Sequence, residues 1–146
     1  ERTMKHIRLN GIIAAVGLTV MLLSVSLLTG CAGFQNLTVP DVQTEENYYK
    51  TETVGLSIRE IINALNTYTT TCTVTGPLPT VNAQDPKLAV ATLYIVGLTE
   101  MSITGVYSFK ESESGNSTTI DAYFYYPTWN SKFDDYVEVL RKPNDC

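Results

Sequence analysis

Carboxylates are the residues of this chain that could most readily do acid–base chemistry, and they come in two groups. Glu111 and Glu113 stand two residues apart, and Asp134, Asp135 and Glu138 fall close together further on. Paired carboxylates can act as general acid and base when burial drives their pKa values apart. The first group falls in a predicted hairpin loop and the second on the polar face of a predicted helix. We therefore expect both to be solvated surface charges.

Other catalytic and ligand-binding patterns are absent from the sequence. The single histidine is His6, which belongs to an N-terminal leader, so the rest of the chain has no Ser-His or Cys-His pair and no imidazole metal ligand. Neither an EF-hand loop nor a glycine-rich phosphate loop is found. The sequence predicts a non-enzymatic protein without a metal or a small-molecule cofactor. An enzyme that uses Asp, Glu or Tyr alone is the remaining alternative.

The N-terminal segment reads as a secretory signal. A basic stub with Lys5, His6 and Arg8 precedes an uncharged run from Gly11 to Leu28, and Met4 is the expected start. A transmembrane helix is the alternative, since about 20 apolar residues span a bilayer. The next charge is the acidic Asp41, rather than the basic residues that usually follow a stop-transfer helix. We therefore expect residues 1–30 to be a signal peptide that is removed.

The signal ends in Leu28-Thr29-Gly30-Cys31, which resembles the lipobox of bacterial lipoproteins. This resemblance implies that Cys31 receives a diacylglyceryl group on its sulfur, becomes the first residue after cleavage and is N-acylated, with palmitate-like chains. Several acyl chains make membrane attachment long-lived. By the same resemblance, Ala32 in place of Asp implies sorting to the outer membrane, with the domain in the periplasm. A simple secretory signal followed by a free cysteine is the alternative.

Charge and cysteine content describe the chain after cleavage. It keeps seven basic and fourteen acidic residues, a net charge of about −7, which argues against binding nucleic acid or anionic lipid headgroups. Cys72 and Cys146 remain beside the lipidated Cys31. In an oxidising compartment an even pair favours one disulfide, although free thiols are the alternative.

Composition divides the chain after cleavage into two parts. Residues 31–53 are polar, lack a sustained period and contain Pro40, which predicts a lipidated N-terminus and a flexible tether. The pair Tyr48-Tyr49 could instead dock on the domain. Residues 54–146 are expected to form one globular domain.

Helix signals open and close this domain. Ser57 and Glu60 have the spacing of a capping box, and the apolar residues that follow predict a helix over 58–70, with Cys72 near its end. The proline-rich residues 76–80 interrupt regular structure. A last helix carries a core face and ends before Pro143. The expected members of that face are Trp129, Phe133, Tyr136, Val137 and Leu140.

The middle of the domain is less clear. Residues 87–98 favour a buried strand by their β-branched side chains, but their length and the preceding Asp85-Pro86 favour a buried helix, which is our prediction. Residues 102–112 and 117–127 alternate in polarity and predict a β-hairpin turning at 114–116. The expected fold is a small single α+β domain of the order helix, helix, hairpin, helix, closed by one disulfide.

Tyr123, Tyr125 and Trp129 are the candidate interface residues. Tyr123 and Tyr125 alternate with Phe124, so they should lie on the outer face of the hairpin, and Tyr and Trp are enriched at protein interfaces. The alternative is that the last helix covers these aromatic side chains.

A second resemblance is carried by Tyr94-Ile95-Val96-Gly97 and Leu140-Arg141-Lys142-Pro143. Over residues 85–145 the chain is similar to the Rap1a/Tai immunity proteins, in which the first motif lies in a helix. This resemblance implies a periplasmic inhibitor of a peptidoglycan-amidase toxin. The family's cysteine before the Tyr-Ile motif and its terminal helical extension are missing here. Our main expectation is an envelope accessory or scaffold lipoprotein that acts by contact with another protein.

Overall fold

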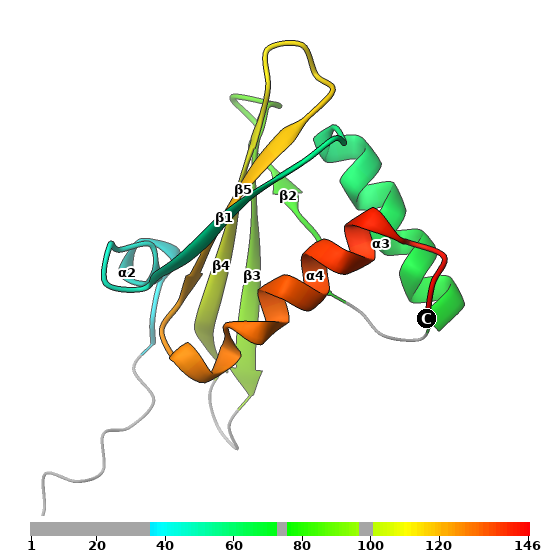
Figure 1. The fold of residues 1–146 in the computed structure, drawn as a ribbon. Coiled ribbons are helices and arrows are strands. Elements are labelled where there is room, and N and C mark those ends of the chain that lie inside the picture. The colour runs from blue at the N-terminus through cyan, green and yellow to red at the C-terminus, as the bar shows by residue number, and fades with distance from the viewer. Residues whose placement is uncertain (1–35, 73–75, 97–100) are drawn as a thin grey trace, which may run out of the picture. The chain divides into compact units, whose positions relative to one another are not determined.

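A five-stranded antiparallel sheet with two helices packed on one face is the architecture of this protein (Figure 1). The computed structural model describes residues 36–72, 76–96 and 101–146. The expected signal peptide and lipobox, Cys31 included, lie outside them. In the sheet order β1-β5-β4-β3-β2, the strands are Tyr48–Val54 (β1), Thr118–Phe124 (β5), Met101–Glu111 (β4), Leu88–Val96 (β3) and Thr80–Val81 (β2).

The first large helix, α3, was correctly predicted. It runs Ile58–Cys72, and the capping box forms: the Glu60 carboxylate accepts a hydrogen bond from the Ser57 backbone N–H at 2.8 Å. In return, Ser57 Oγ accepts one from the Glu60 backbone N–H at 3.3 Å. The buried residues Ile61 and Leu65, one turn apart, place the apolar face of α3 on the sheet.

The predicted helix over 87–98 is wrong, because residues 88–96 form the strand β3. Asp85 does not cap a helix: its carboxylate accepts the Lys87 backbone N–H at 2.9 Å and its carbonyl oxygen accepts the Leu88 N–H, which closes the turn from β2 to β3. Ala89 and Ala91 point toward the helices and are buried. These small side chains leave room for the larger core residues of the helices and of β4. The β-branched residues that alternate with them favour a strand.

The predicted hairpin is confirmed as β4 and β5. The turn contains Gly115, whose φ of 74° is a left-handed conformation that suits glycine. Tyr107, Phe109, Ile120 and Ala122 face the helices and are fully buried. These four positions of the hairpin therefore build the core, whereas Tyr126, two residues beyond Phe124, is exposed.

The predicted tether, residues 31–53, is wrong in its second half, because that part of the chain belongs to the folded domain. Val39–Val42 form a short helix, α2, on the other face of the sheet, where Gln43 bonds Ser108. Residues 48–54 form the edge strand β1, paired with β5. Polar residues dominate β1 because one of its faces is exposed, and this composition hid the strand from the sequence prediction.

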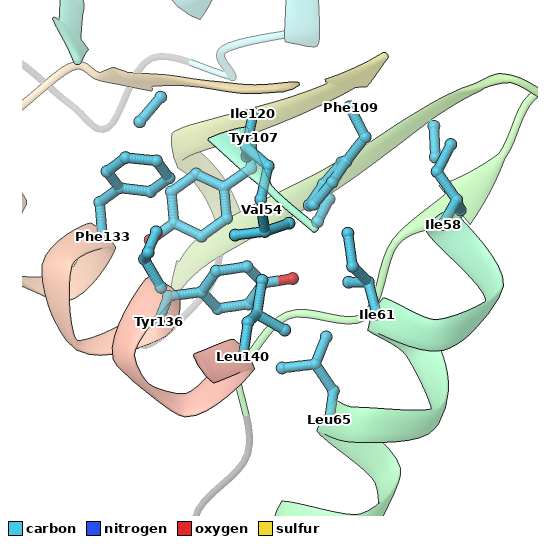
Figure 2. Packing of buried hydrophobic residues seen from close by; sticks show 14 of the residues in the cluster. Val54, Ile58, Ile61, Leu65, Tyr107, Phe109, Ile120, Phe133, Tyr136 and Leu140 are labelled. Carbon is cyan, nitrogen blue, oxygen red and sulfur yellow. The ribbon is translucent and has the colours of Figure 1, made fainter. Parts of the chain in front are cut away.

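The last helix, α4, runs Ser131–Arg141 and follows a short 3₁₀ turn at Pro127–Trp129. Phe133, Tyr136, Val137 and Leu140 are buried, as predicted, whereas Trp129 is half-buried. Figure 2 shows Phe133 and Tyr136 of α4 beside Tyr107, and Leu140 of α4 next to Leu65 of α3. The two helices and the sheet thus share one core.

The predicted disulfide is confirmed: Cys72, at the end of α3, is bonded to Cys146, with 5.5 Å between their Cα atoms. The predicted order helix, helix, hairpin, helix is wrong. The structure is instead mostly an antiparallel sheet, because β1 and β3 are strands where a tether and a helix were expected. None of the helices described, of which α3 is the longest, has the length and apolar character to cross a bilayer.

Candidate functional site

Four tyrosines near the shared end of β1 and β5 form the surface that we call the tyrosine patch: Tyr48, Tyr123, Tyr125 and Tyr126. Tyr48 is the cross-strand partner of Tyr123, and their rings meet edge to face with centroids 5.8 Å apart. The Tyr125 and Tyr126 rings do the same at 5.0 Å. The exposed fractions of Tyr48, Tyr125 and Tyr126 are 47%, 37% and 40%.

Two of the three predicted interface residues, Tyr123 and Tyr125, belong to the tyrosine patch. Tyr123 alternates with the buried Ala122 and Phe124, so it points away from α3 and α4, and helix α4 does not cover it. Trp129 packs instead on the core beneath the helices, on the other side of the sheet. Sequence reasoning missed Tyr48 as an interface candidate because it placed this residue in the tether. The pair Tyr48-Tyr49 was the available signal.

Tyr48 and Tyr49 lie on opposite sides of the sheet, as neighbours in a strand normally do. The irregularity of β1 between Tyr48 and Lys50 puts Tyr49 and Lys50 on the same side, where both bond Asp134. The Tyr49 ring contacts Phe124 and Phe133, and its hydroxyl donates to the Asp134 carboxylate at 3.0 Å. That hydrogen bond is the main cause of the raised pKa of Tyr49. Tyr48 therefore lies on the patch, while Tyr49 contacts α4 on the other side of the sheet.

A hollow, which we call the α3–α4 cavity, lies on the helix side of the sheet and has a volume of about 730 Å³. Seven aromatic and aliphatic side chains line it, together with five charged residues from α4 and the segment after it. The apolar walls include Leu65, Tyr68, Leu93, Tyr107, Trp129, Tyr136 and Val139.

Two tyrosines of the cavity wall are buried and differ in their hydrogen bonding. Tyr136 donates its hydroxyl proton to the carbonyl oxygen of Pro77 at 3.1 Å. The Tyr107 hydroxyl has no hydrogen-bond partner among the described residues, although its ring packs on Tyr136 and Phe133 with centroids 4.8 and 5.3 Å apart. Burial is the main cause of the raised pKa of both phenols, so both remain protonated at neutral pH.

Of the predicted surface carboxylates of α4, Asp134 and Glu138 form ion pairs, and Asp135 lines the cavity. Lys50 of β1 lies 2.8 Å from Glu52 and 3.2 Å from Asp134 of α4, and Arg141 lies 3.1 Å from Glu52. The hydrogen bond from Lys50 is the main cause of the lowered pKa of Glu52. These exposed charges connect the edge strand to α4.

Glu111 and Glu113 have separate roles and do not act as a pair. Glu111 accepts a hydrogen bond from the backbone N–H of Ile58, the first residue of α3, at 2.7 Å. Glu113 forms an ion pair with Lys87 across the hairpin end. No cluster of potential ligands for a metal ion occurs among residues 36–72, 76–96 and 101–146.

A comparison with models of protein families and a comparison with curated proteins find no significant match to this chain. Of the immunity-protein motif, Tyr94 and Ile95 lie in the strand β3, rather than in the helix that the resemblance implies. Gly97 of that motif lies outside the described residues.

Proposed function

We propose that this protein is a non-enzymatic lipoprotein of the bacterial envelope whose domain binds a protein partner through the tyrosine patch. The observation that carries the contact is the presence of four tyrosines, three of them exposed, near the end of β5, where Tyr123 points away from α3 and α4. Tyrosine supplies a large contact area at a low cost in side-chain entropy and is enriched where binding energy concentrates.

Support for the envelope location comes from the signal-like segment and from the disulfide. The lipobox-like Leu28-Thr29-Gly30-Cys31 implies a lipid on Cys31. A disulfide between Cys72 and Cys146 suits an exported domain, because reducing systems keep cytosolic thiols free. We propose the outer membrane, with the domain in the periplasm, as the location. Metabolic labelling with a palmitate analogue tests the anchor: label must enter the wild type and be lost in Cys31→Ser.

The contact is tested by capture of partners from detergent-solubilised envelopes with the lipidated full chain. The test variant is Tyr48→Ser/Tyr125→Ser/Tyr126→Ser, which removes the three exposed rings. The matched control is Leu78→Ser/Val81→Ser/Leu88→Ser, which removes three similarly exposed apolar side chains. Two of these control positions lie on β2 and β3, away from the patch.

We expect one protein to co-purify with the wild type and the control variant and to be lost with the patch variant. Equal recovery with all three proteins would refute the tyrosine patch as the contact. If the partner is a peptidoglycan amidase, the protein is an immunity inhibitor rather than an accessory module.

A further inference from the structure

We propose that the α3–α4 cavity binds an uncharged, ring-containing small molecule that carries a hydrogen-bonding group. This inference goes beyond the proposed protein contact, because none of the four tyrosines of the patch lines the cavity. It rests on the size of the cavity, its aromatic walls, one hydroxyl that opens on it and the charges among its lining residues.

The size and walls of the cavity match a ligand site. Its volume of about 730 Å³ lies within the range of roughly 300–1,000 Å³ that small-molecule pockets occupy. The rings of Tyr68, Tyr107, Trp129 and Tyr136 come from α3, β4, the 3₁₀ turn and α4. Aromatic side chains prefer edge-to-face or offset contacts with other rings, so these walls favour a ring-containing ligand.

The Tyr107 hydroxyl supplies the specific polar group. Tyr107 is 0% exposed, and Figure 2 shows its ring reaching from β4 toward Phe133 and Tyr136 of α4. Among the residues that the structure describes, no fully buried side-chain oxygen or nitrogen lacks a hydrogen-bond partner, so a Tyr107 hydroxyl without one must open on the cavity. Within the described part of the chain no side chain or backbone group bonds this hydroxyl, while the residue lines the cavity. A ligand that offers a hydrogen-bonding group would satisfy it.

The charged residues that line the cavity argue against a charged ligand. Lys132 and Lys142 stand beside Asp135, Glu138 and Asp145, so both signs are present. Glu138 and Lys142 also pair with each other at 3.6 Å. Because both signs line the cavity, an uncharged molecule avoids both a repulsive contact and the cost of burying an unpaired charge.

Binding is tested with two dyes that share one ring frame, N-phenyl-1-naphthylamine and 8-anilinonaphthalene-1-sulfonate. The first is uncharged and has an N–H group, and the second adds a sulfonate. Trp129, the only tryptophan of the chain, lines the cavity and is the fluorescence donor. We expect the uncharged dye to quench Trp129 by energy transfer and to bind at least tenfold more tightly than the sulfonate.

Two pairs of variants localise the dye. Tyr107→Phe should weaken binding about tenfold, the value of one hydrogen bond, without lowering the melting temperature. Tyr136→Phe, which loses the bond to Pro77, should lower it. Val139→Phe fills the cavity from α4 and should abolish binding, whereas Val81→Phe on β2 should leave it unchanged. Circular dichroism verifies that each variant folds.

Competition separates ring-containing ligands from acyl chains. We expect 2-naphthol, an uncharged ring compound with a hydroxyl, to displace the dye at lower concentration than palmitate does. The proposal is overturned if neither dye quenches Trp129, if the sulfonate binds as tightly as the uncharged dye, or if palmitate is the better competitor. Unchanged affinity in both Tyr107→Phe and Val139→Phe would overturn it as well.

Discussion

The carboxylate of Glu111, at the end of β4, accepts a hydrogen bond from the backbone N–H of Ile58, the first residue of α3, at 2.7 Å. The first N–H groups of a helix have no partner within the helix, and its N-terminus favours a negative charge. Glu111 therefore completes the cap that Ser57 and Glu60 begin, and it connects the helix to the sheet.

Replacing Glu111 should destabilise the domain at this junction. We expect Glu111→Ala to lower the free energy of unfolding by about 1–2 kcal/mol, because the buried Ile58 N–H loses its acceptor. Denaturant unfolding measures the change. Glu113→Ala, which loses only the exposed pair with Lys87, is the control and should change it by less than about 0.5 kcal/mol. Equal effects of the two substitutions would contradict the capping role.

The disulfide should contribute more than any single cap. It joins residues separated by 74 positions, and closing a loop of that length stabilises by about 4 kcal/mol in the chain-entropy model. Cys72→Ser/Cys146→Ser should lose that amount in denaturant unfolding. The reduced wild type should unfold at the same denaturant concentration as the double variant. If reduction left the unfolding midpoint unchanged, the bridge would not form in solution.

Acid should weaken the contact between β1 and α4. The folded pKa of Glu52 lies below its ordinary value of 4.5, chiefly through the hydrogen bond from Lys50. This stabilisation is therefore present above pH 4.5 and is lost as the pH falls through the lowered pKa. Glu52→Gln should show a smaller fall in melting temperature on acidification than the wild type, measured by calorimetry. Glu46→Gln, at an exposed position, is the control and should follow the wild type.

Alkali should act on the core through Tyr107 and Tyr136. Burial raises the pKa of both above the ordinary value of 10.0, so the folded state holds protons that the unfolded chain releases. Stability is complete below pH 10 and falls as the pH rises above it. In a titration followed by tyrosinate absorbance, two of the nine tyrosines should ionise only together with unfolding. Ionisation of all nine in the folded protein would contradict their burial.

Sequence reasoning succeeded where a local pattern decides the structure. The capping box of Ser57 and Glu60 marks the start of α3, and the alternation of residues such as Tyr107 and Phe109 marks the hairpin. The disulfide followed from the number of cysteines and the expected compartment. Each of these signals is contained in a few neighbouring residues or in composition.

Sequence reasoning failed where pairing with a segment distant in the chain decides the secondary structure. The apolar run of β3 suits either a buried helix or a strand, and pairing with β4 selects the strand. The polar β1 becomes a strand only by pairing with β5, whose partner residues lie about 70 positions later. The candidate site shows the same limit: the tyrosines of β5 were found, but Tyr48, Tyr107 and the α3–α4 cavity depend on the assembled sheet.

Site-specific photo-crosslinking in living cells tests the proposed contact most directly. A benzophenone amino acid is placed at Tyr48 or Tyr125 of the patch, or at Val81 on β2 at the opposite edge of the sheet. The account predicts an adduct with the same envelope protein from both tyrosine positions and none from Val81. Adducts of equal yield at Val81, or none at either tyrosine position, would contradict it.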